Sequence, residues 1–408
     1  MIAHLDADAF FASVLQRKHP HLKGKPLLAA GMGGGCVIAA SYEAKAKGVK
    51  TGMPVWEAIK LCPEAIRMPA DFRETGIASK QIESMLQNVC PIIEQYSIDE
   101  WFLDLRSCVG GIPTQLEQWA AELQKSIGSK TDLSVSIGIG PTKLLAKMAS
   151  EYRKPAGITV VRRDVRIARL YGMDIKTFLQ DRPTPAIPGI GRQREKHTAA
   201  HGWATAWDFA NANQAEVKKL FGKNGPELQR ELLGECVSEV TCDVAPPKSV
   251  SRTRAFKATA NRELLWAHIL HHVQYIVLKM RKHGLRCHGV SVWVRDRDYH
   301  HAGSTKRLPQ ALDTEESLLP YLRTCFEECY QPGKGYNQAG ACLWGLTGGD
   351  AHQLTLFQSA NESIKDEHLQ HALDVIRHRF GREVITRGQA LSVMEEHRPE
   401  LEISVYET

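Results

Sequence analysis

Apolar positions follow two different periods along the first 165 residues of this 408-residue chain. Some short segments are continuously apolar or alternate in polarity, as β-strands do. These are residues 2–5, 26–30, 36–40, 102–105 and 134–139. Other segments repeat apolar side chains every three or four positions, as amphipathic helices do. These are residues 55–61, 116–127 and 142–148. The two periods together predict a mixed fold in which helices cover a sheet.

A different pattern follows in residues 246–300. A long apolar helix is predicted at 264–280 and a strand at 289–294. The same region has eleven Lys or Arg residues and three Asp or Glu residues, a net charge of +8. A helix followed by a strand, with a basic face, is typical of a small α+β domain that binds nucleic acid. The alternative is a basic face that only contacts solvent. Further along, polar composition surrounds a last helical pattern at 369–385.

The overall composition restricts the class of protein. Hydrophobic residues make up 43% of the chain and charged residues 24%, as in ordinary globular proteins. No apolar stretch reaches the ~18 residues of a membrane helix, and the N-terminus lacks a secretory pattern. We therefore expect a cytoplasmic protein without a membrane partner. Ten scattered cysteines predict reduced thiols, not a disulfide framework or a zinc site.

Two acidic groups stand beside predicted strands. Asp6 and Asp8 end the first strand, and Asp99 and Glu100 directly precede the strand at 102–105. Adjacent carboxylates repel each other unless they face water or hold a cation. An oxygen-rich cluster suits Mg²⁺, and two such ions ~3.5–4 Å apart can drive an in-line phosphoryl transfer. The spacing alone leaves open both a metal site and a solvated turn without an ion.

Several segments, in this order, resemble motifs of the Y-family translesion DNA polymerases. They are residues 6–14, 41–45, 48–54, 96–100, 136–140, 143–147, 154–157 and 187–191. The resemblance extends from residue 1 to about residue 357. The opening motif and Tyr42 look like DNA polymerase IV, whereas residues 35–39 and the tail look more like the catalytic subunit of polymerase V. The subgroup therefore stays open.

The resemblance implies an α+β fold, with a right-hand polymerase of palm, fingers and thumb and a C-terminal little finger domain. The implied boundaries are 1–10 and 71–165 for the palm, 11–70 for the fingers, 166–235 for a thumb with a helix-hairpin-helix, 236–245 for a linker, 246–346 for the little finger and 347–408 for the tail. The basic region at 246–300 would then lie in the domain that grips DNA.

The resemblance also assigns the acidic groups. Asp6, Asp99 and Glu100 would be catalytic carboxylates that hold two Mg²⁺ ions, and the backbone carbonyl of Ala7 would be a further ligand. A metal-activated primer 3′-hydroxyl would attack the α-phosphate of an incoming dNTP. Asp8 is not assigned as a ligand, and we interpret it as a structural or solvated carboxylate.

Four side chains are implied in substrate binding. Phe11 matches the steric gate, whose ring leaves no room for a 2′-hydroxyl, and the alternative is an apolar core residue beside Phe10. Tyr42, Lys45 and Lys154 match positions that contact the triphosphate, where cations offset the charge of the leaving pyrophosphate. Lone lysines are usually solvated, so these assignments depend on the motif.

The remaining motifs imply macromolecular partners. Gly189 and Gly191 belong to a helix-hairpin-helix turn whose backbone N–H groups can approach a DNA phosphate. Lys248, Arg252 and Arg254 begin the basic region and are predicted to bind primer–template DNA. A five-residue tail peptide resembles the bacterial sliding-clamp motif, with clamp contacts predicted for Gln353, Leu354, Leu356 and Phe357. The polymerase V likeness also implies accessory proteins.

We therefore predict a template-directed, low-fidelity translesion DNA polymerase without proofreading. One alternative is a non-catalytic relative that serves as a clamp-binding scaffold, but such relatives lack the metal carboxylates present here. Another is a palm-type nucleotidyl cyclase, which would share the two-metal chemistry. A cyclase would not explain the helix-hairpin-helix or the basic little finger.

Overall fold

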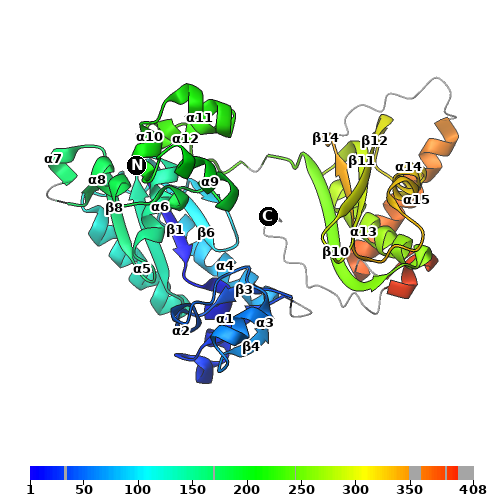
Figure 1. The fold of residues 1–408 in the computed structure, drawn as a ribbon, viewed down its shortest axis with the longest axis horizontal. Helices are drawn as coiled ribbons and strands as arrows, with labels where there is room; N and C mark the ends of the chain where they lie inside the picture. The colour runs from blue at the N-terminus through cyan, green and yellow to red at the C-terminus, as the bar shows by residue number, and fades with distance from the viewer. Residues whose placement is uncertain (32–34, 169–170, 244, 349–359, 382–383, 394–408) are drawn as a thin grey trace. The chain divides into compact units, whose positions relative to one another are not determined.

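The computed structural model describes residues 1–31, 35–168, 171–243, 245–348, 360–381 and 384–393. These residues form two compact units that meet in sequence near residue 244 (Figure 1). Each unit combines helices with a β-sheet, which confirms the predicted α+β class. Among the described residues, every helix is too short or too polar to cross a lipid bilayer.

A six-stranded sheet organises the first unit, with the order β5-β6-β1-β7-β8-β9. Its strands are β1 (Ile2–Ala7), β5 (Ile93–Gln95), β6 (Glu100–Asp104), β7 (Val135–Gly140), β8 (Ile158–Arg162) and β9 (Met173–Asp174). The central strand β1 pairs antiparallel with both β6 and β7. The strands predicted near residues 2, 102 and 134 are therefore confirmed, and they are neighbours in space.

Helices cover the two faces of this sheet differently. Helices α4 (Phe72–Gln87) and α5 (Leu116–Thr131) bury Leu5, Trp101 and Ile137 on one face. Helix α6 (Lys143–Tyr152) packs on the other face, against β1, β7 and β8. It comes very close to β7, because a Cβ atom at Gly138 would lie 2.1 Å from the carbonyl oxygen of Ala146. Only glycine permits that approach.

Residues 8–70 add a smaller layer with three strands in the order β3-β2-β4. Its elements are α1 (Phe10–Lys18), β2 (Leu27–Ala30), β3 (Val37–Ala40), α2 (Tyr42–Ala46), α3 (Val55–Leu61) and β4 (Ile66–Pro69). The two strands predicted at 26–30 and 36–40 pair antiparallel, as β2 and β3. This layer places α1 directly after β1 and α2 directly after β3.

A helical group follows the large sheet. It consists of α7 (Val165–Ala168), α8 (Ile175–Gln180), α9 (Arg192–Ala200), α10 (Ala206–Ala210), α11 (Gln214–Phe221) and α12 (Asn224–Leu232). Its core includes Phe178, Phe209 and Leu232, which share one apolar cluster with Leu145 of α6. The helical group is thus anchored to the helix that also faces the carboxylate-bearing strands.

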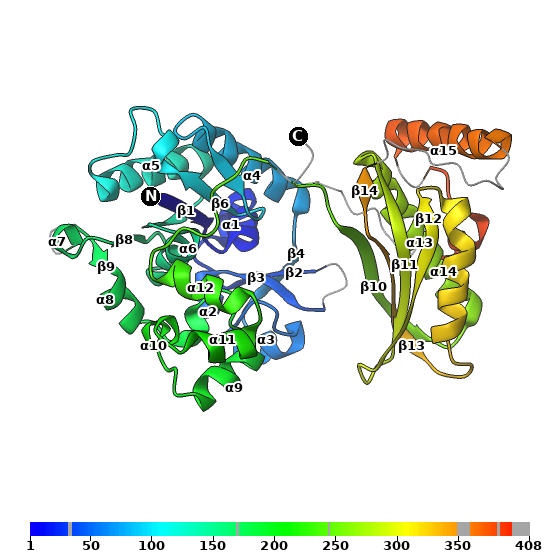
Figure 2. The same cartoon turned by 90° about the horizontal axis from the view of Figure 1, so that it is seen from above.

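The second unit is built on a sheet with the order β10-β13-β11-β12, and β14 pairs with β11. The elements are β10 (Ser249–Thr259), α13 (Arg262–Lys282), β11 (Leu285–Arg295), β12 (His301–Leu312), α14 (Glu315–Cys329), β13 (Tyr336–Trp344) and β14 (Thr347–Gly348). Helices α13 and α14 lie on the same side of this sheet (Figure 2). The predicted helix at 264–280 and strand at 289–294 are confirmed as α13 and β11.

The C-terminal segment packs on the second unit. Helix α15 (Ala360–Phe380) begins earlier than the predicted 369–385 and ends directly before Gly381, whose φ is +97°. The guanidinium of Arg377 lies 2.6 Å from a carboxylate oxygen of Glu315 on α14. The short helix η4 (Gly388–Val393) adds buried Val393. The predicted clamp contacts at 353–357 lie outside the described residues.

Candidate active site

Two carboxylates meet across neighbouring strands of the large sheet. The register pairs Asp6 of β1 with Glu100 of β6 and with Ser136 of β7. Directly opposed residues on paired strands point to the same face of a sheet. Because Leu5 and Ala7 are buried under α4 and α5, Asp6 and its partners face α6. The sheet register therefore brings Asp6 and Glu100 together.

Helix α6 and the turn after it supply the charged neighbours of these carboxylates. Lys147 forms an ion pair with Glu100. The ammonium of Lys154 lies 2.7 Å from an oxygen of Asp6 and 2.8 Å from an oxygen of Glu151. Asp6, Glu100 and Glu151 each offer an oxygen, and these oxygens lie within 4.8 Å of one another. They form a three-carboxylate group bordered by two lysines.

Glu151 is a member of this group that the motifs did not indicate. It lies four residues after Lys147 on α6, and residues at this spacing share a helix face. The predicted helix ended at residue 148, so this signal was outside the predicted segment. A longer helix would have placed Glu151 beside Lys147.

Burial raises the cost of the negative charge in this group. The side chain of Asp6 is 7% exposed and that of Glu100 is 15% exposed, so they do not form a solvated turn. Burial raises the pKa of Asp6 to about 8, although Lys154 opposes this shift. Burial, together with the charge of Glu100, also raises the pKa of Asp99. Negative charge here is under-compensated, and a bound cation would relieve it.

The donor set of the group fits a hard divalent cation. Carboxylate oxygens are the ligands that Mg²⁺ prefers in proteins. Asp99 lies next to the group in the chain, and its carboxylate accepts a hydrogen bond of 2.8 Å from the hydroxyl of Ser97. Its carbonyl accepts the N–H of Ala7, which ends β1. The structure thus groups Asp6 with Glu100 and directs the Asp99 carboxylate to Ser97.

A cationic group adjoins the carboxylates from the smaller layer. The ammonium of Lys45 on α2 lies 4.5 Å from the centre of the Tyr42 ring. Burial and the charge of Lys154 lower the pKa of Lys45, so the two ammonium groups influence each other. Within the described part of the chain, no carboxylate forms an ion pair with Lys45. Two lysines and a tyrosine hydroxyl therefore suit a polyanionic ligand such as a polyphosphate.

The two phenylalanines after the first strand have different surroundings. Phe10 is 2% exposed and belongs to the core of the large sheet. Phe11 is partly exposed in the first turn of α1, with its ring centre 5.4 Å from that of Phe72 in an edge-on contact. Phe10 is therefore a core residue. Phe11 also packs against the apolar cluster of the smaller layer, so both the steric gate and a packing role stay open for it.

The glycine-containing turn before α9 is open to solvent. Ile187 and Ile190 are buried and anchor it, whereas Gly189 and Gly191 are exposed. Gly189 has a φ of +94°, and a Cβ atom at either glycine would meet no atom within 4 Å. The backbone of this turn can therefore approach an extended ligand closely. Exposed cations follow it on α9: Arg192, Arg194 and Lys196.

Two of the three predicted basic residues of the second unit lie on the helix-covered side of its sheet. Arg252 is on the helix-covered side, with its guanidinium 4.3 Å from the centre of the Tyr275 ring on α13. Strand alternation places Arg254 on that side as well. Lys248 is exposed just before β10. The opposite side carries Lys257 and Arg295, which belong to the eleven basic residues at 246–300, and Arg307, which lies beyond that region.

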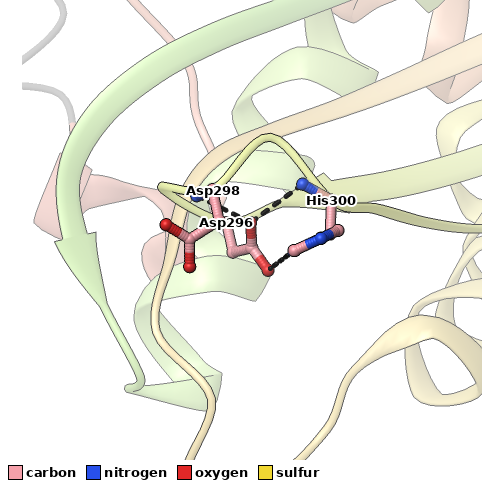
Figure 3. A group of neighbouring side chains, drawn as sticks. All are labelled: Asp296, Asp298 and His300. Carbon is pink, nitrogen blue, oxygen red and sulfur yellow. Dashed lines mark hydrogen bonds and ion pairs between the residues drawn. The ribbon is translucent and has the colours of Figure 1, made fainter.

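A second group of possible metal ligands, Asp296, Asp298 and His300, lies between β11 and β12 (Figure 3). One oxygen of Asp296 accepts the backbone N–H groups of Asp298 and His300, each at 2.9 Å. Its other oxygen lies 2.9 Å from the ammonium of Lys334, and this contact holds the pKa of Asp296 below its usual range. The group therefore stabilises a turn.

Known proteins match this chain over most of its length. Residues 5–151 match the impB/mucB/samB family, and residues 247–356 match the C-terminal domain of that family. DNA polymerase IV 1 of Halalkalibacterium halodurans is 32% identical, over 97% of this chain and 94% of its own. DNA polymerase IV of Oceanobacillus iheyensis is 31% identical, over 95% of this chain and 91% of its own.

A solved structure has a similar fold. It is a Y-family DNA polymerase chimera of Dbh and Dpo4, with a TM-score of 0.71 and 24% identity. The match covers 85% of this chain and 99% of the chimera. At this identity, the likeness concerns the fold alone.

Proposed function

This chain belongs to the Y family of translesion DNA polymerases and is a DNA-directed DNA polymerase, and we propose that it extends primers across damaged templates with low fidelity. The observation that carries this proposal is the convergence of buried Asp6 and partly buried Glu100 with the cations Lys45 and Lys154. One end of the site can hold a metal ion, and the other can hold a triphosphate.

We propose the polymerase IV type, because relatives of that name match nearly the whole chain. Asp6, Asp99, Glu100 and the carbonyl of Ala7 would hold two Mg²⁺ ions. When bound, Mg²⁺ supplies activation of the primer 3′-hydroxyl and stabilisation of the leaving pyrophosphate. Before Mg²⁺ binds, Lys147 pairs with Glu100 and Lys154 pairs with Asp6.

Three residues from the site contact the dNTP itself. Tyr42, Lys45 and Lys154 bind the triphosphate, and the two ammonium groups offset the charge that develops on the leaving pyrophosphate. The partly exposed ring of Phe11 excludes a 2′-hydroxyl by its bulk and offers that hydroxyl no hydrogen bond. These roles make dNTPs the substrates. Binding of the primer–template DNA depends on other surfaces of the protein.

A primer-extension assay tests this function most directly. The full chain should extend a primer on a template in the presence of Mg²⁺ and four dNTPs, and chelation of Mg²⁺ should stop extension. A labelled mismatched primer end should persist without excision, because we propose that the enzyme lacks proofreading. If the full chain does not extend the primer with Mg²⁺ and four dNTPs present, the proposed function is overturned.

We propose that DNA is bound through its phosphates at two places. One is the turn with Gly189 and Gly191, and the other is the basic second unit, which includes Lys248, Arg252 and Arg254. The open side of the second sheet adds Lys257, Arg295 and Arg307, beside the hydroxyl-bearing side chains of Ser251 and Thr253. Backbone contacts of this kind bind many sequences equally well.

DNA affinity should fall steeply with salt and depend weakly on DNA sequence. Each neutralised phosphate contributes about −0.9 to the slope of log affinity against log salt concentration. Arg307→Ala should therefore make the slope shallower by about one. Equilibrium binding at several salt concentrations measures this slope. The matched control is Lys306→Ala, because the ammonium of Lys306 pairs with Glu328 of α14 on the helix-covered side. An equal slope change in both variants would contradict the assignment of the open side.

We further propose that the peptide at 353–357 binds a sliding clamp. Replacing Leu356 and Phe357 with Ala removes its apolar anchors, and buried anchors of this kind typically carry ~2 kcal/mol or more each. Clamp affinity should fall more than about tenfold. Extension without the clamp should be normal, whereas stimulation by a loaded clamp should be lost.

The neighbouring substitution Gln358→Ala serves as the control, because it lies just outside the five-residue motif. Full clamp stimulation in the variant without Leu356 and Phe357 would place the contact elsewhere. Equal loss of activity with and without the clamp would make the segment structural. We also propose a place in the cytoplasm. The accessory proteins implied by the polymerase V likeness belong to the alternative subgroup and not to the polymerase IV type.

A further inference from the structure

Asp8 is a buried carboxylate beside the active site that the proposed chemistry does not use. Its side chain is 1% exposed. One oxygen accepts hydrogen bonds from the hydroxyls of Ser136, at 2.7 Å, and Tyr42, at 3.3 Å. The other oxygen accepts the backbone N–H of Ala156 at 2.8 Å. An ionised carboxylate is an acceptor only, and three neutral donors satisfy it here.

These donors come from parts of the chain that are far apart in sequence. Tyr42 begins α2 in the smaller layer, Ser136 lies on β7, and Ala156 belongs to the turn that follows Lys154. The hydroxyl of Ser136 also accepts the N–H of Gly157, at 3.3 Å. Two successive amides of the Lys154 turn are therefore attached to Asp8, one directly and one through Ser136.

The Lys154 turn is also closely packed, so these bonds fix its position. A Cβ atom at Gly157 would lie 2.1 Å from the carbonyl oxygen of Arg153, so the chain requires glycine there. The same turn directs the ammonium of Lys154 to Asp6. A shift at Asp8 would therefore move Lys154 relative to the metal-binding carboxylates.

We propose that Asp8 is a positioning residue for the incoming triphosphate. It fixes the distance between the hydroxyl of Tyr42 and the turn that carries Lys154. The side chains of Tyr42 and Lys154 can then contact the triphosphate of the same dNTP. This role rests on the proposed function and deepens it, because it identifies what aligns contacts from the fingers with one from the palm. Asp8 itself touches neither substrate nor metal.

An isosteric change at Asp8 separates this role from a structural one. Asp8→Asn replaces one acceptor oxygen with an NH₂ group, which donates hydrogen bonds. This NH₂ group must face either the backbone N–H of Ala156 or the hydroxyls of Ser136 and Tyr42, where an acceptor stood before. An unsatisfied buried donor has a real cost, so the network should rearrange. A merely structural Asp8 would lower the unfolding temperature without changing dNTP binding selectively.

In the full chain, Asp8→Asn should raise the KM for dNTP by about tenfold or more, with a smaller change in kcat. Equilibrium binding of dNTP to the enzyme on a primer without a 3′-hydroxyl should weaken equally, and DNA affinity should not change. The control is Thr159→Val on β8. Thr159 is buried and its hydroxyl has no hydrogen-bond partner among the described residues, so its loss should not alter the KM.

A double-mutant cycle tests whether Asp8 acts through Tyr42. In the Tyr42→Phe background, Asp8→Asn should raise the KM by less than it does in the wild type. If Asp8→Asn does not fold, Ser136→Ala replaces it, because it breaks one link to the Lys154 turn. An unchanged dNTP KM in the folded variant would overturn the positioning role. A wild-type chain that extends no primer would instead overturn the proposed function.

Discussion

Asp99→Ala and Glu100→Ala will each slow nucleotide addition by at least about 10³-fold, while DNA affinity will stay nearly unchanged. Metal ions in such sites supply several kcal/mol of transition-state stabilisation, and each 1.36 kcal/mol corresponds to a tenfold rate change. Glu100 lies opposite Asp6 in the sheet register, so its loss removes an oxygen from the three-carboxylate group proposed to hold metal. Single-turnover primer extension measures the rate, and equilibrium binding measures the affinity.

A matched control comes from the adjacent strand. Glu94 on β5 also pairs with a lysine of α6, Lys143, at 2.6 Å, but it is not part of the three-carboxylate group. Glu94→Gln should therefore keep most of the activity. Near wild-type extension by Glu100→Ala would contradict the metal assignment. An equal loss in Glu94→Gln would show that any broken carboxylate–lysine pair on this sheet impairs the enzyme.

Phe11→Ala will narrow the preference for dNTPs over ribonucleotides by about 10–100-fold, since forcing extra volume into a packed site typically costs ~1–3 kcal/mol. Removal of the ring opens the space that a 2′-hydroxyl needs. Because Phe11 is partly exposed and packs edge-on against Phe72, the substitution should leave the core around Phe10 intact. The ratio of insertion efficiencies for the two nucleotides is the measurement.

Phe72→Ala provides the comparison for this steric gate. It removes the ring that packs against Phe11 but keeps the gate itself, so it should shift the preference much less. Thermal unfolding should show that both variants fold. A folded Phe11→Ala variant with an unchanged preference would mean that the ring only packs, and the gate would then have to be another side chain.

Local patterns were sufficient for the three strands at the centre of the candidate site. The apolar runs at 2–5, 102–105 and 134–139 became β1, β6 and β7, because apolar runs must bury their side chains against a neighbour. The right-hand fold with a little finger, implied by the family resemblance, is confirmed by the likeness to solved Y-family structures. The least accurate prediction concerned the tail, where α15 begins before the apolar spacing does.

The candidate site was only partly visible in the sequence. Asp6 and Glu100 stand in recognisable motifs. The predicted strands 2–5 and 102–105 leave both residues outside, whereas β1 and β6 include them. Glu151 was missed, because its place in the group depends on how closely α6 packs over Gly138. Arg252 was selected for its charge, although the alternation of β10 turns it toward α13. Charge can be read from sequence, but the face of a sheet depends on what covers it.

The sequence by itself determined which segments have the apolar spacing of strands or of helices, and the order of the motifs. It also identified the carboxylates Asp6 and Glu100. These are properties of residues close together in the chain, where propensity and periodicity act directly. Only the tertiary structure decided that Asp8 joins Tyr42 to the Lys154 turn, that Glu151 completes the carboxylate group and which cations lie on the open sheet. The two contacts of Asp8 link residues 34 and 148 positions apart. All of these arrangements depend on strand register and helix packing, which local sequence does not specify.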